Sequence, residues 1–301
     1  MILITGATGF IGSHILEKLI SRYGADQVIA LTSKKINNVN YLLHNNYDFD
    51  DNYLINNGCK DVSTIIHAAA FIPKSAFDAN DIAQCNSNIV STDRLLRQKL
   101  PNLKKVVFLS TTDVYENTND TITEATVVAP GSLYGHSKFY CEGLLRAVCN
   151  QKDVDYSILR IGHVYGPGEE KYKKIIPEVM RSILENRPVK LWGDGEDLRS
   201  FIYISDVVEV ILNAVKTQGI SEPINVVSDK SFSIKEIVDA VIKISTLNID
   251  IERIPSNHIR RDLTFSNSML KKYLHVPDVD IYTGLKIEWA QLKEKYEKNN
   301  L

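Results

Sequence analysis

Two side chains suited to proton transfer, Tyr134 and Lys138, stand four residues apart in the sequence. Residues at positions i and i+4 of a helix share one face, so a helix here places the phenol beside the ammonium. Bringing the pKa of a tyrosine from about 10 to neutrality takes about 4 kcal/mol, and a nearby ammonium in a partly dehydrated site supplies much of that. The spacing favours Tyr134 as an acid or base at a carbinol or carbonyl oxygen. Both residue types are common on helix surfaces, so the pair alone is a weak signal.

A cluster of hydroxyl groups follows a buried apolar run. The segment Lys105–Ser110 is typical of a buried strand, and Ser110, Thr111 and Thr112 stand at its end. In parallel sheets, ligands bind beyond the carboxyl ends of the strands. We therefore expect Thr111 or Ser110 to hydrogen-bond the same substrate oxygen as Tyr134, although an ordinary polar turn has similar residues.

Three glycines, Gly6, Gly9 and Gly12, connect a strand pattern to a helical one. The first permits a tight turn, the second lets the backbone approach a pyrophosphate, and the third lets helix and strand pack closely. The helix N-terminus then offers free N–H groups to the phosphates. The spacing is GxxGxxG rather than GxGxxG, but its context favours a dinucleotide site over a turn that binds nothing. The expected contacts are Gly6, Thr8, Gly9, Phe10, Ile11 and Gly12.

The end of the second expected strand should lie beside the adenosine ribose of that dinucleotide. An acidic side chain at this position accepts from the 2′-hydroxyl and selects NAD. This chain has Thr32, Ser33, Lys34 and Lys35 instead, which suit a 2′-phosphate better. We therefore expect NADP as the favoured cofactor and NAD as the alternative, although incidental lysines on a solvated loop have the same appearance.

Other cofactor contacts are expected along the rest of the nucleotide. Asp48 could accept from the adenine amino group, with Phe49 beside the base, and Lys138 could hold the hydroxyls of the nicotinamide ribose. The expected contacts outside the glycine loop and the second strand are Asp48, Phe49, Ala68, Ala69, Ala70, Tyr134 and Lys138.

Short apolar runs alternate with helical patterns through the first 165 residues. The expected strands are Met1–Thr5, Gln27–Leu31, Ser63–Ala68, Lys105–Ser110 and Tyr156–Ile161, and Pro223–Val227 could add a further strand. This alternation predicts an α/β fold, a doubly wound parallel sheet of the Rossmann type with helices on both faces. Beyond Tyr165 the pattern loosens, with helices expected over 176–186 and 285–299.

Composition excludes several classes of protein. Of 301 residues, 44% are apolar and 24% charged, which rules out intrinsic disorder, and the net charge of −2 lacks the basic field of a nucleic-acid binder. The four cysteines form no CxxC pair, so we expect neither a metal site nor a disulfide framework, and a reducing cytoplasm. No apolar run approaches the ~18 residues of a membrane span, so no membrane partner is expected.

Five motifs in order resemble the extended short-chain dehydrogenase/reductases, and more narrowly their nucleotide-sugar epimerase/dehydratase branch. The motifs are GATGFIG from Gly6, STTDVY from Ser110, YGHSK from Tyr134, LRIGHVYGPG from Leu159, and GDG with RSFIYISD from Gly193 and Arg199. The resemblance runs to about Leu274 and implies an NAD(P)-binding Rossmann domain with a smaller C-terminal substrate-binding lobe. The corresponding division is 1–166 plus about 200–240, and 167–199 plus about 241–301.

The resemblance also implies roles for single residues. Thr111, Tyr134 and Lys138 fall on the family's catalytic residues, and Asn88 falls on a structural asparagine. Arg199 falls on an arginine that contacts the substrate diphosphate, which suits a guanidinium, although a surface salt bridge is the alternative.

Departures from the family pattern narrow the range of reactions that the resemblance implies. The family's dehydratases carry an acidic pair after the catalytic threonine, whereas this chain has Thr112 and Asp113, which disfavours a 4,6-dehydratase. His163 replaces a common asparagine and either donates to the diphosphate or is structural. Arg261, next to Arg260, lies near a second phosphate-binding arginine of the family. The expected substrate contacts are Thr112, His163, Arg199 and Arg261.

The resemblance leaves three functions open. The first is reduction of a nucleotide-linked 4-keto-6-deoxy sugar at C4 by NADPH, favoured by the missing acid at Thr32. The second is an NAD-dependent nucleotide-sugar 4-epimerase that uses the same residues. The third, a non-catalytic dinucleotide-sensing regulator, is disfavoured because Tyr134 and Lys138 are both present. A nucleoside-diphosphate sugar is the expected partner, and family members commonly form homodimers.

Overall fold

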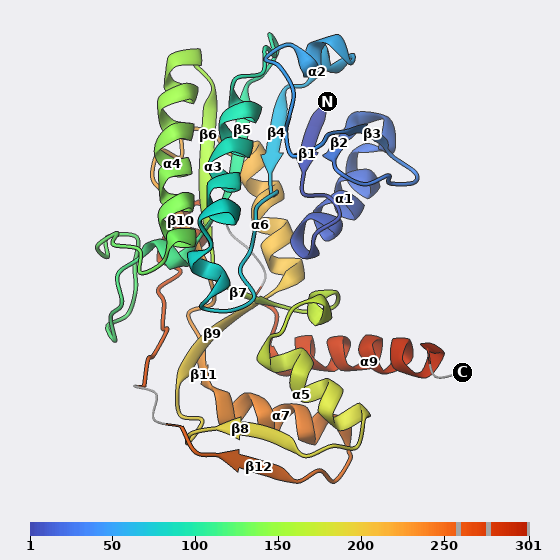
Figure 1. Cartoon of the computed structure of the whole chain (residues 1–301), viewed down its shortest axis with the longest axis vertical. Coiled ribbons are helices and arrows are strands. Elements are labelled where there is room, and N and C mark those ends of the chain that lie inside the picture. The colour runs from blue at the N-terminus through green and yellow to red at the C-terminus, as the bar shows by residue number, and fades with distance from the viewer. Residues whose placement is uncertain (257–259, 275–277, 300–301) are drawn as a thin grey trace.

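A seven-stranded parallel sheet forms the larger part of the computed structural model, which describes residues 1–256, 260–274 and 278–299 (Figure 1). Every neighbouring pair of strands is parallel. Across the sheet the strands are β10 (Ile224–Val226), β6 (Asp155–Ile161), β5 (Lys105–Thr111), β4 (Thr64–His67), β1 (Ile2–Thr5), β2 (Val28–Thr32) and β3 (Asn40–Leu43). The parallel order brings the carboxyl ends of these strands to one edge.

Helices cover both faces of this sheet, and apolar side chains alternate between the two. Along β1, Leu3 belongs to one buried cluster and Ile4 to the other. Helices α1 (Phe10–Tyr23) and α6 (Ile204–Lys216) contact each other on one side, while α3 (Ile82–Leu96) and α4 (Leu133–Lys152) do so on the other. The doubly wound parallel fold predicted from the sequence is therefore confirmed.

A smaller part of the molecule lies beyond the carboxyl edge of the sheet (Figure 1). Its strands form one sheet of three and one of two: β11 (Ser231–Ser233), β9 (Leu198–Tyr203) and β7 (His163–Tyr165), and β12 (Ile251–Ile254) with β8 (Val189–Trp192). Helices α7 (Ile234–Ser245), α5 (Ile175–Leu184) and α9 (Ile281–Asn299) pack against one another. The division of the chain into two domains stays a prediction.

The remaining elements are short. They are α2 (Tyr53–Asn56), α8 (Ser268–Leu274), and the single-turn helices η1 (Ala25–Gln27), η2 (Cys59–Asp61), η3 (Asp78–Asn80), η4 (Thr112–Val114) and η5 (Glu169–Lys171). Over the ranges that the structure describes, none of the helices combines the length and the apolar character that crossing a membrane requires.

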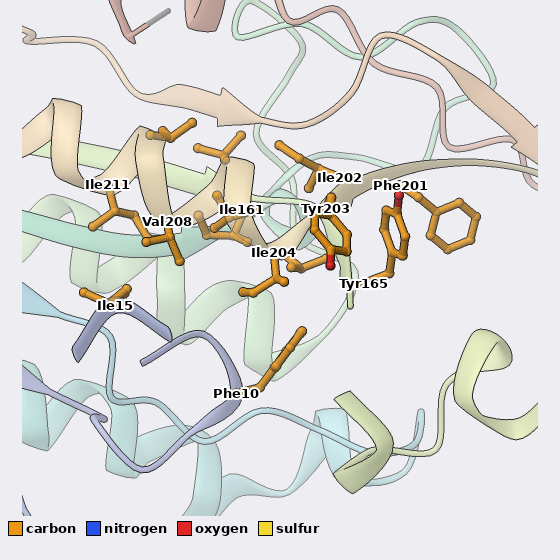
Figure 2. Close-up of a cluster of buried hydrophobic side chains, with 14 of the residues drawn as sticks. Phe10, Ile15, Ile161, Tyr165, Phe201, Ile202, Tyr203, Ile204, Val208 and Ile211 are labelled. Carbon is orange, nitrogen blue, oxygen red and sulfur yellow. The ribbon is translucent and has the colours of Figure 1, made fainter. Parts of the chain in front are cut away.

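Aromatic and aliphatic side chains join the two parts of the molecule (Figure 2). The rings of Tyr165 and Tyr203 lie with centroids 5.2 Å apart, and Phe201 meets Tyr165 edge to face at 6.3 Å. Phe10 and Tyr203 belong to the same buried cluster, so the glycine loop and the smaller part share one apolar junction. Aromatic pairs of this geometry add about 0.5–1.5 kcal/mol each beyond the burial of their area.

A buried ion pair fastens α4 to the sheet. Glu142 is fully buried, and its carboxylate accepts from Arg160 through Nε at 3.0 Å and Nη2 at 2.8 Å. Ser110 of β5 donates to the same carboxylate at 2.6 Å. Since Arg160 lies on β6, one helical side chain binds both strands at the edge where ligands are expected.

We predict that Glu142→Ala lowers the free energy of unfolding by about 3–5 kcal/mol, because it leaves the Arg160 guanidinium buried without a counter-charge. Replacing both partners, by Glu142→Leu with Arg160→Met, should cost less than the single change. Urea unfolding measures both. The exposed pair of Glu185 and Arg187 is the control, with Glu185→Ala expected to change stability by no more than about 0.5 kcal/mol. A loss below about 1 kcal/mol for Glu142→Ala would contradict this account.

Candidate active site

The glycine loop makes a close crossing between β1, β4 and α1. Gly6 has φ +71°, and a Cβ there would lie 2.6 Å from the Ala69 nitrogen, so a side chain is excluded. A Cβ at Gly12 would overlap the Gly6 carbonyl. Gly9 donates its N–H to that same carbonyl at 2.9 Å and precedes the first turn of α1. The contacts at Gly6 and Gly12 account for two of the glycines in the motif.

The N-terminus of α1 has no side-chain cap at Gly9, so its first N–H groups face the loop without a side-chain acceptor. These groups, with the partial positive charge of the helix end, suit a pyrophosphate. The loop and helix end therefore fit a dinucleotide, with a glycine cradle that side chains would fill.

A cavity of about 490 Å³, called here the main cavity, opens at this edge of the sheet. It brings together residues from four of the five motifs found in the sequence, with Ala68, Ala69 and Ala70. The predicted residues that line it are Gly6, Thr8, Gly9, Phe10, Ile11, Gly12, Ala68, Ala69, Ala70, Thr111, Thr112, Tyr134, Lys138 and His163.

The proposed catalytic residues converge within this cavity. Tyr134 and Lys138 lie in the first two turns of α4, where Ser132 caps the helix by accepting from the Gly135 N–H at 3.1 Å. Gly135 packs directly on the backbone of Asp113, which brings this turn against the end of β5. Thr111, Tyr134 and Lys138 are each at most 7% exposed.

Burial controls the titration of these groups. It raises the pKa of Tyr134 above its usual value, the charge of Asp113 raises it further, and a hydrogen bond from Thr111 opposes the rise. Burial also lowers the pKa of Lys138 to about 8, and its Nζ lies 4.3 Å from the Phe108 ring centre. In the protein alone, desolvation therefore dominates the pKa of Tyr134, and Lys138 is not among the groups that lower it as expected.

A second cavity, of about 590 Å³, continues from Gly6 toward the end of β2. Thr32 and Ser33 line it as expected, whereas Lys34 does not, and the Lys34 N–H donates to Thr32 Oγ1 at 3.2 Å. Lys35 also lies outside the lining. The two hydroxyls, rather than the two ammonium groups, face the expected ribose position.

The expected adenine contacts are displaced by a few residues. Asp48 and Phe49 do not line the second cavity, while His44, Asn46 and Tyr47 do. Phe49 instead stacks on the Tyr53 ring with centroids 4.7 Å apart. Asn46 and Tyr47 adopt positive φ angles of 48° and 58°, a backbone reversal that residue types alone did not indicate.

The expected substrate residues separate into two groups. A third cavity, of about 280 Å³, shares His163 with the main cavity and is also lined by Arg199. Arg199 donates to the carbonyl oxygens of Leu198 and Arg261, which leaves part of its guanidinium for a ligand. Arg261 is exposed and lines none of the three cavities, and Arg260 pairs with Asp262 at 3.0 Å.

His163 is a neutral group at the junction of the main and third cavities. Burial lowers its pKa to about 4, and the charges of Lys174, Arg199 and Arg261 lower it further. Its Nδ1 is buried without a hydrogen-bond partner in the part of the chain that the structure describes. An unpaired buried nitrogen costs free energy, so a ligand group that pairs with it gains that free energy back.

Two charged side chains of the main cavity were not predicted as site residues. Lys174 lines both the main and third cavities, with Nζ 3.0 Å from Glu169 Oε2 and 2.7 Å from the Val164 carbonyl oxygen. Asp113 lines the main cavity, where desolvation raises the pKa of its carboxyl and Arg261 opposes the rise. Asp113 directly follows the hydroxyl cluster in the sequence, which could have indicated its place in the site. Lys174 belongs to no motif, so only the folded structure indicates it.

Within the residues that the structure describes, His, Cys, Asp and Glu side chains nowhere gather in a group of three that could hold a metal ion. Cys59, Cys85, Cys141 and Cys149 are all buried as free thiols.

We predict that Gly12→Ala weakens NAD binding by about tenfold or more, because the added methyl group forces α1 away from Gly6 at an overpacking cost of about 1–3 kcal/mol. Calorimetric titration with NAD measures the change. The matched control is Gly143→Ala on α4, where an added Cβ meets nothing within 4 Å. The control should raise stability by about 0.5–1 kcal/mol and leave NAD affinity unchanged, and equal NAD affinity in both variants would contradict the assignment of the loop.

Comparisons with known proteins agree with this geometry. Residues 2–226 match the model of the NAD dependent epimerase/dehydratase family. The Bacillus subtilis protein named "Uncharacterized UDP-glucose epimerase YtcB" is 31% identical, over 98% of this chain and 99% of its own. Arabidopsis thaliana GDP-mannose 3,5-epimerase is 26% identical, over 98% of this chain and 82% of its own.

A solved structure extends the comparison to three dimensions. UDP-glucuronic acid 4-epimerase from Bacillus cereus, in complex with NAD, superposes with a TM-score of 0.84 at 25% identity, over 98% of this chain and 99% of that one. The family match covers most of the chain and includes the glycine loop and the Tyr134 helix. The protein belongs to the NAD-dependent epimerase/dehydratase family of nucleotide-sugar enzymes.

Proposed function

We propose that this protein is an NAD-dependent 4-epimerase of a UDP-linked sugar, with UDP-glucose as the first substrate to test. The observation that carries the proposal is the convergence of Thr111, Tyr134 and Lys138 on the cavity formed by the glycine loop. The epimerase names of the B. subtilis relative and of the B. cereus structure support the choice of reaction.

The reaction needs a proton to leave and return at the C4 oxygen of the sugar. In the cofactor complex Tyr134 acts as the phenolate: it accepts the proton of the C4 hydroxyl and later donates it back, and Thr111 orients that oxygen through a hydrogen bond. Lys138, with the positive charge of the bound nicotinamide, stabilises the phenolate before it takes up that proton and after it returns it. When bound, NAD supplies a reversible acceptor for the hydride of C4. Most of the rate acceleration comes from the fixed orientation of these groups around the sugar and from their stabilisation of developing charge.

The third cavity is the proposed place for the diphosphate of the substrate. Arg199 provides a guanidinium that forks onto phosphate oxygens, and His163 provides a neutral ring at the junction. Lys174 adds a second cation within reach of both cavities. Thr112 lies in the main cavity, on the sugar side, and Arg261 requires a movement of its exposed side chain to reach a substrate.

Reduction of a 4-keto-6-deoxy sugar by NADPH, the function first expected, has weaker support. No similar protein named above is a reductase, and the B. cereus structure contains NAD. Thr32 and Ser33 at the ribose position remain the observation in its favour. No observation favours a catalytically silent sensor, because the relatives are named as enzymes and the chain has the Tyr134 and Lys138 side chains that a sensor does not need.

We also infer that two copies of the chain pair through α3 and α4. A groove of about 770 Å³ runs between these helices, and Ile82 and Tyr140 along it are 76% and 58% exposed. Leu145 of α4 is buried in the protein's own core, while its neighbour Leu144 lines the groove. The homodimer and the cytoplasmic location stay predictions.

We predict that Tyr134→Phe lowers kcat for interconversion of UDP-glucose and UDP-galactose by about 10²–10⁴-fold, because only the proton-transferring oxygen is removed. Product formation by chromatography measures kcat and KM. Tyr282→Phe, at an exposed position of α9, is the control and should leave both constants unchanged. Retention of more than a tenth of the activity by Tyr134→Phe would count against the proposed role.

We predict that protein purified without added nucleotide carries NAD rather than NADP, released on denaturation at close to one per chain. The double variant Lys34→Ala with Lys35→Ala should keep its NAD content, because these side chains lie outside the second cavity. Chromatography of the released nucleotide measures both. Empty protein that prefers NADPH, with that preference lost in the double variant, would favour the reductase instead.

A further inference from the structure

His67, the last residue of β4, is a buried imidazole with a partner on each ring nitrogen. It is 2% exposed. Its Nδ1 lies 2.7 Å from Thr5 Oγ1 at the end of β1, and its Nε2 lies 3.0 Å from Thr92 Oγ1 on α3. The ring therefore spans the space between the central strands and one of the two helices on this face of the sheet.

The neighbouring hydrogen bonds assign the tautomer of His67. Thr92 Oγ1 lies 2.7 Å from the Asn88 carbonyl oxygen, which can only accept, so the Thr92 proton points there. Thr92 Oγ1 must then accept from the Nε2–H of His67. In the neutral ring Nδ1 is an acceptor, and it receives the hydroxyl proton of Thr5, whose oxygen in turn accepts the Ala69 N–H at 3.1 Å.

One end of this chain of hydrogen bonds lies in the cofactor site. Thr5 directly precedes Gly6, and both Gly6 and Ala69 line the main cavity. The backbone of Gly6 packs against that of Ala69 so closely that a Cβ would not fit between them. The Thr5 hydroxyl therefore fixes the two strand ends that form the floor of the dinucleotide site.

The other end lies in the catalytic helix. The Asn88 side chain accepts from the Phe71 N–H at 2.7 Å and donates through Nδ2 to Ser137 Oγ at 3.2 Å. Ser137 Oγ donates to the Tyr134 carbonyl oxygen at 2.8 Å. Since the Asn88 backbone carbonyl accepts from Thr92, one residue joins the imidazole's partner to the turn that carries Tyr134.

The chain requires the neutral form of the imidazole. Burial, with the charge of Lys138, lowers the pKa of His67 to about 3, so the ring is neutral at physiological pH. Burying a polar ring costs more free energy than burying an aliphatic side chain of similar volume, unless both ring nitrogens are hydrogen-bonded. The ring therefore keeps its two hydrogen-bond partners in one arrangement.

We propose that His67 is a positioning residue that joins the cofactor-binding ends of β1 and β4 to the helix carrying Tyr134 and Lys138. Its Nδ1 acts on the cofactor side through Thr5, and its Nε2–H acts on the catalytic side through Thr92. The inference deepens the proposed function and rests on it for its kinetic readout, but not for its binding readout.

Two substitutions separate the two ends of the ring. His67→Asn places an acceptor near the position of Nδ1 and keeps the bond from Thr5, but it loses the bond to Thr92. His67→Gln places a donor near the position of Nε2 and keeps the bond to Thr92, but it loses the bond from Thr5. Thr92→Val breaks the catalytic side without altering the imidazole. The matched control is His136→Asn, an exposed histidine on α4.

His67→Asn and Thr92→Val should lower kcat by about ten- to a hundredfold, with KM and NAD affinity close to those of the unaltered protein. His67→Gln should weaken NAD binding by about tenfold and retain most of kcat at saturating NAD. Calorimetric NAD titration and steady-state kinetics measure these effects, and thermal melts show that each variant is folded. The control should change none of these quantities.

Equal losses of NAD affinity in His67→Asn and His67→Gln, or losses that follow only the folded fraction, would overturn the inference and leave His67 a core residue. Failure of the unaltered protein to convert any UDP-sugar would instead overturn the proposed function. The NAD titrations need no turnover, so the split in affinity between the two His67 variants decides the inference in that case as well.

Discussion

The buried carboxylate of Glu142 holds the catalytic helix in place, and the proposed site depends on that contact. Tyr134 and Lys138 lie on α4, whereas Thr111 lies at the end of β5. Glu142 binds Arg160 of β6 and Ser110 of β5, one residue before Thr111. A helix could otherwise slide or rotate on an apolar sheet, because hydrophobic contact has little directionality. The ion pair and its hydrogen bond fix the position of the helix at the point where the hydroxyl and the phenol must meet.

Desolvation is the second constraint on the site. The same burial that raises the pKa of Tyr134 lowers that of Lys138 to about 8. In a poorly hydrated cavity, charge interactions are stronger than in water, so a cation placed there stabilises a phenolate more effectively. The protein alone therefore keeps Tyr134 as a phenol, and its deprotonation requires further positive charge in the cavity. The charge of Asp113 raises the pKa of Tyr134 and so opposes that deprotonation. The protonation state of Tyr134 therefore depends on the charge of the ligand in the cavity.

The parallel sheet and most of the proposed catalytic set were predictable from the sequence, because their signals are local. Buried strands such as β5 are apolar throughout, and glycines at a strand-to-helix turn have few alternative explanations. The short strands of the smaller part were not predicted. Strand β9 begins with Leu198, Arg199 and Ser200, so only its second half is apolar. Strand β3, at the edge of the seven-stranded sheet, was not predicted either, because it is short and half exposed. Tertiary pairing, rather than local preference, makes these segments strands.

The adenosine end and the substrate residues show where sequence reasoning fails. Tyr47, which had no expected role, lines the second cavity in place of Asp48 and Phe49 because the chain after β3 turns through positive φ angles at Asn46 and Tyr47. Lys34 lies outside that cavity. Lys174 enters both cavities from a segment without a motif, since its position depends on the contact with Glu169. Residues near a regular element are placed by its geometry, whereas residues on long connections are placed by contacts that only the folded chain reveals.

In the proposed reaction, Tyr134 and Thr111 act on the C4 oxygen of a UDP-sugar while the C4 hydrogen stays within the site. The most direct measurement uses UDP-glucose with deuterium at C4, incubated with the purified protein and no added nucleotide. We expect UDP-galactose that retains the deuterium at C4, as seen by mass spectrometry and NMR. Loss of the deuterium to water, or conversion of a 4-keto sugar only when NADPH is added, would contradict it.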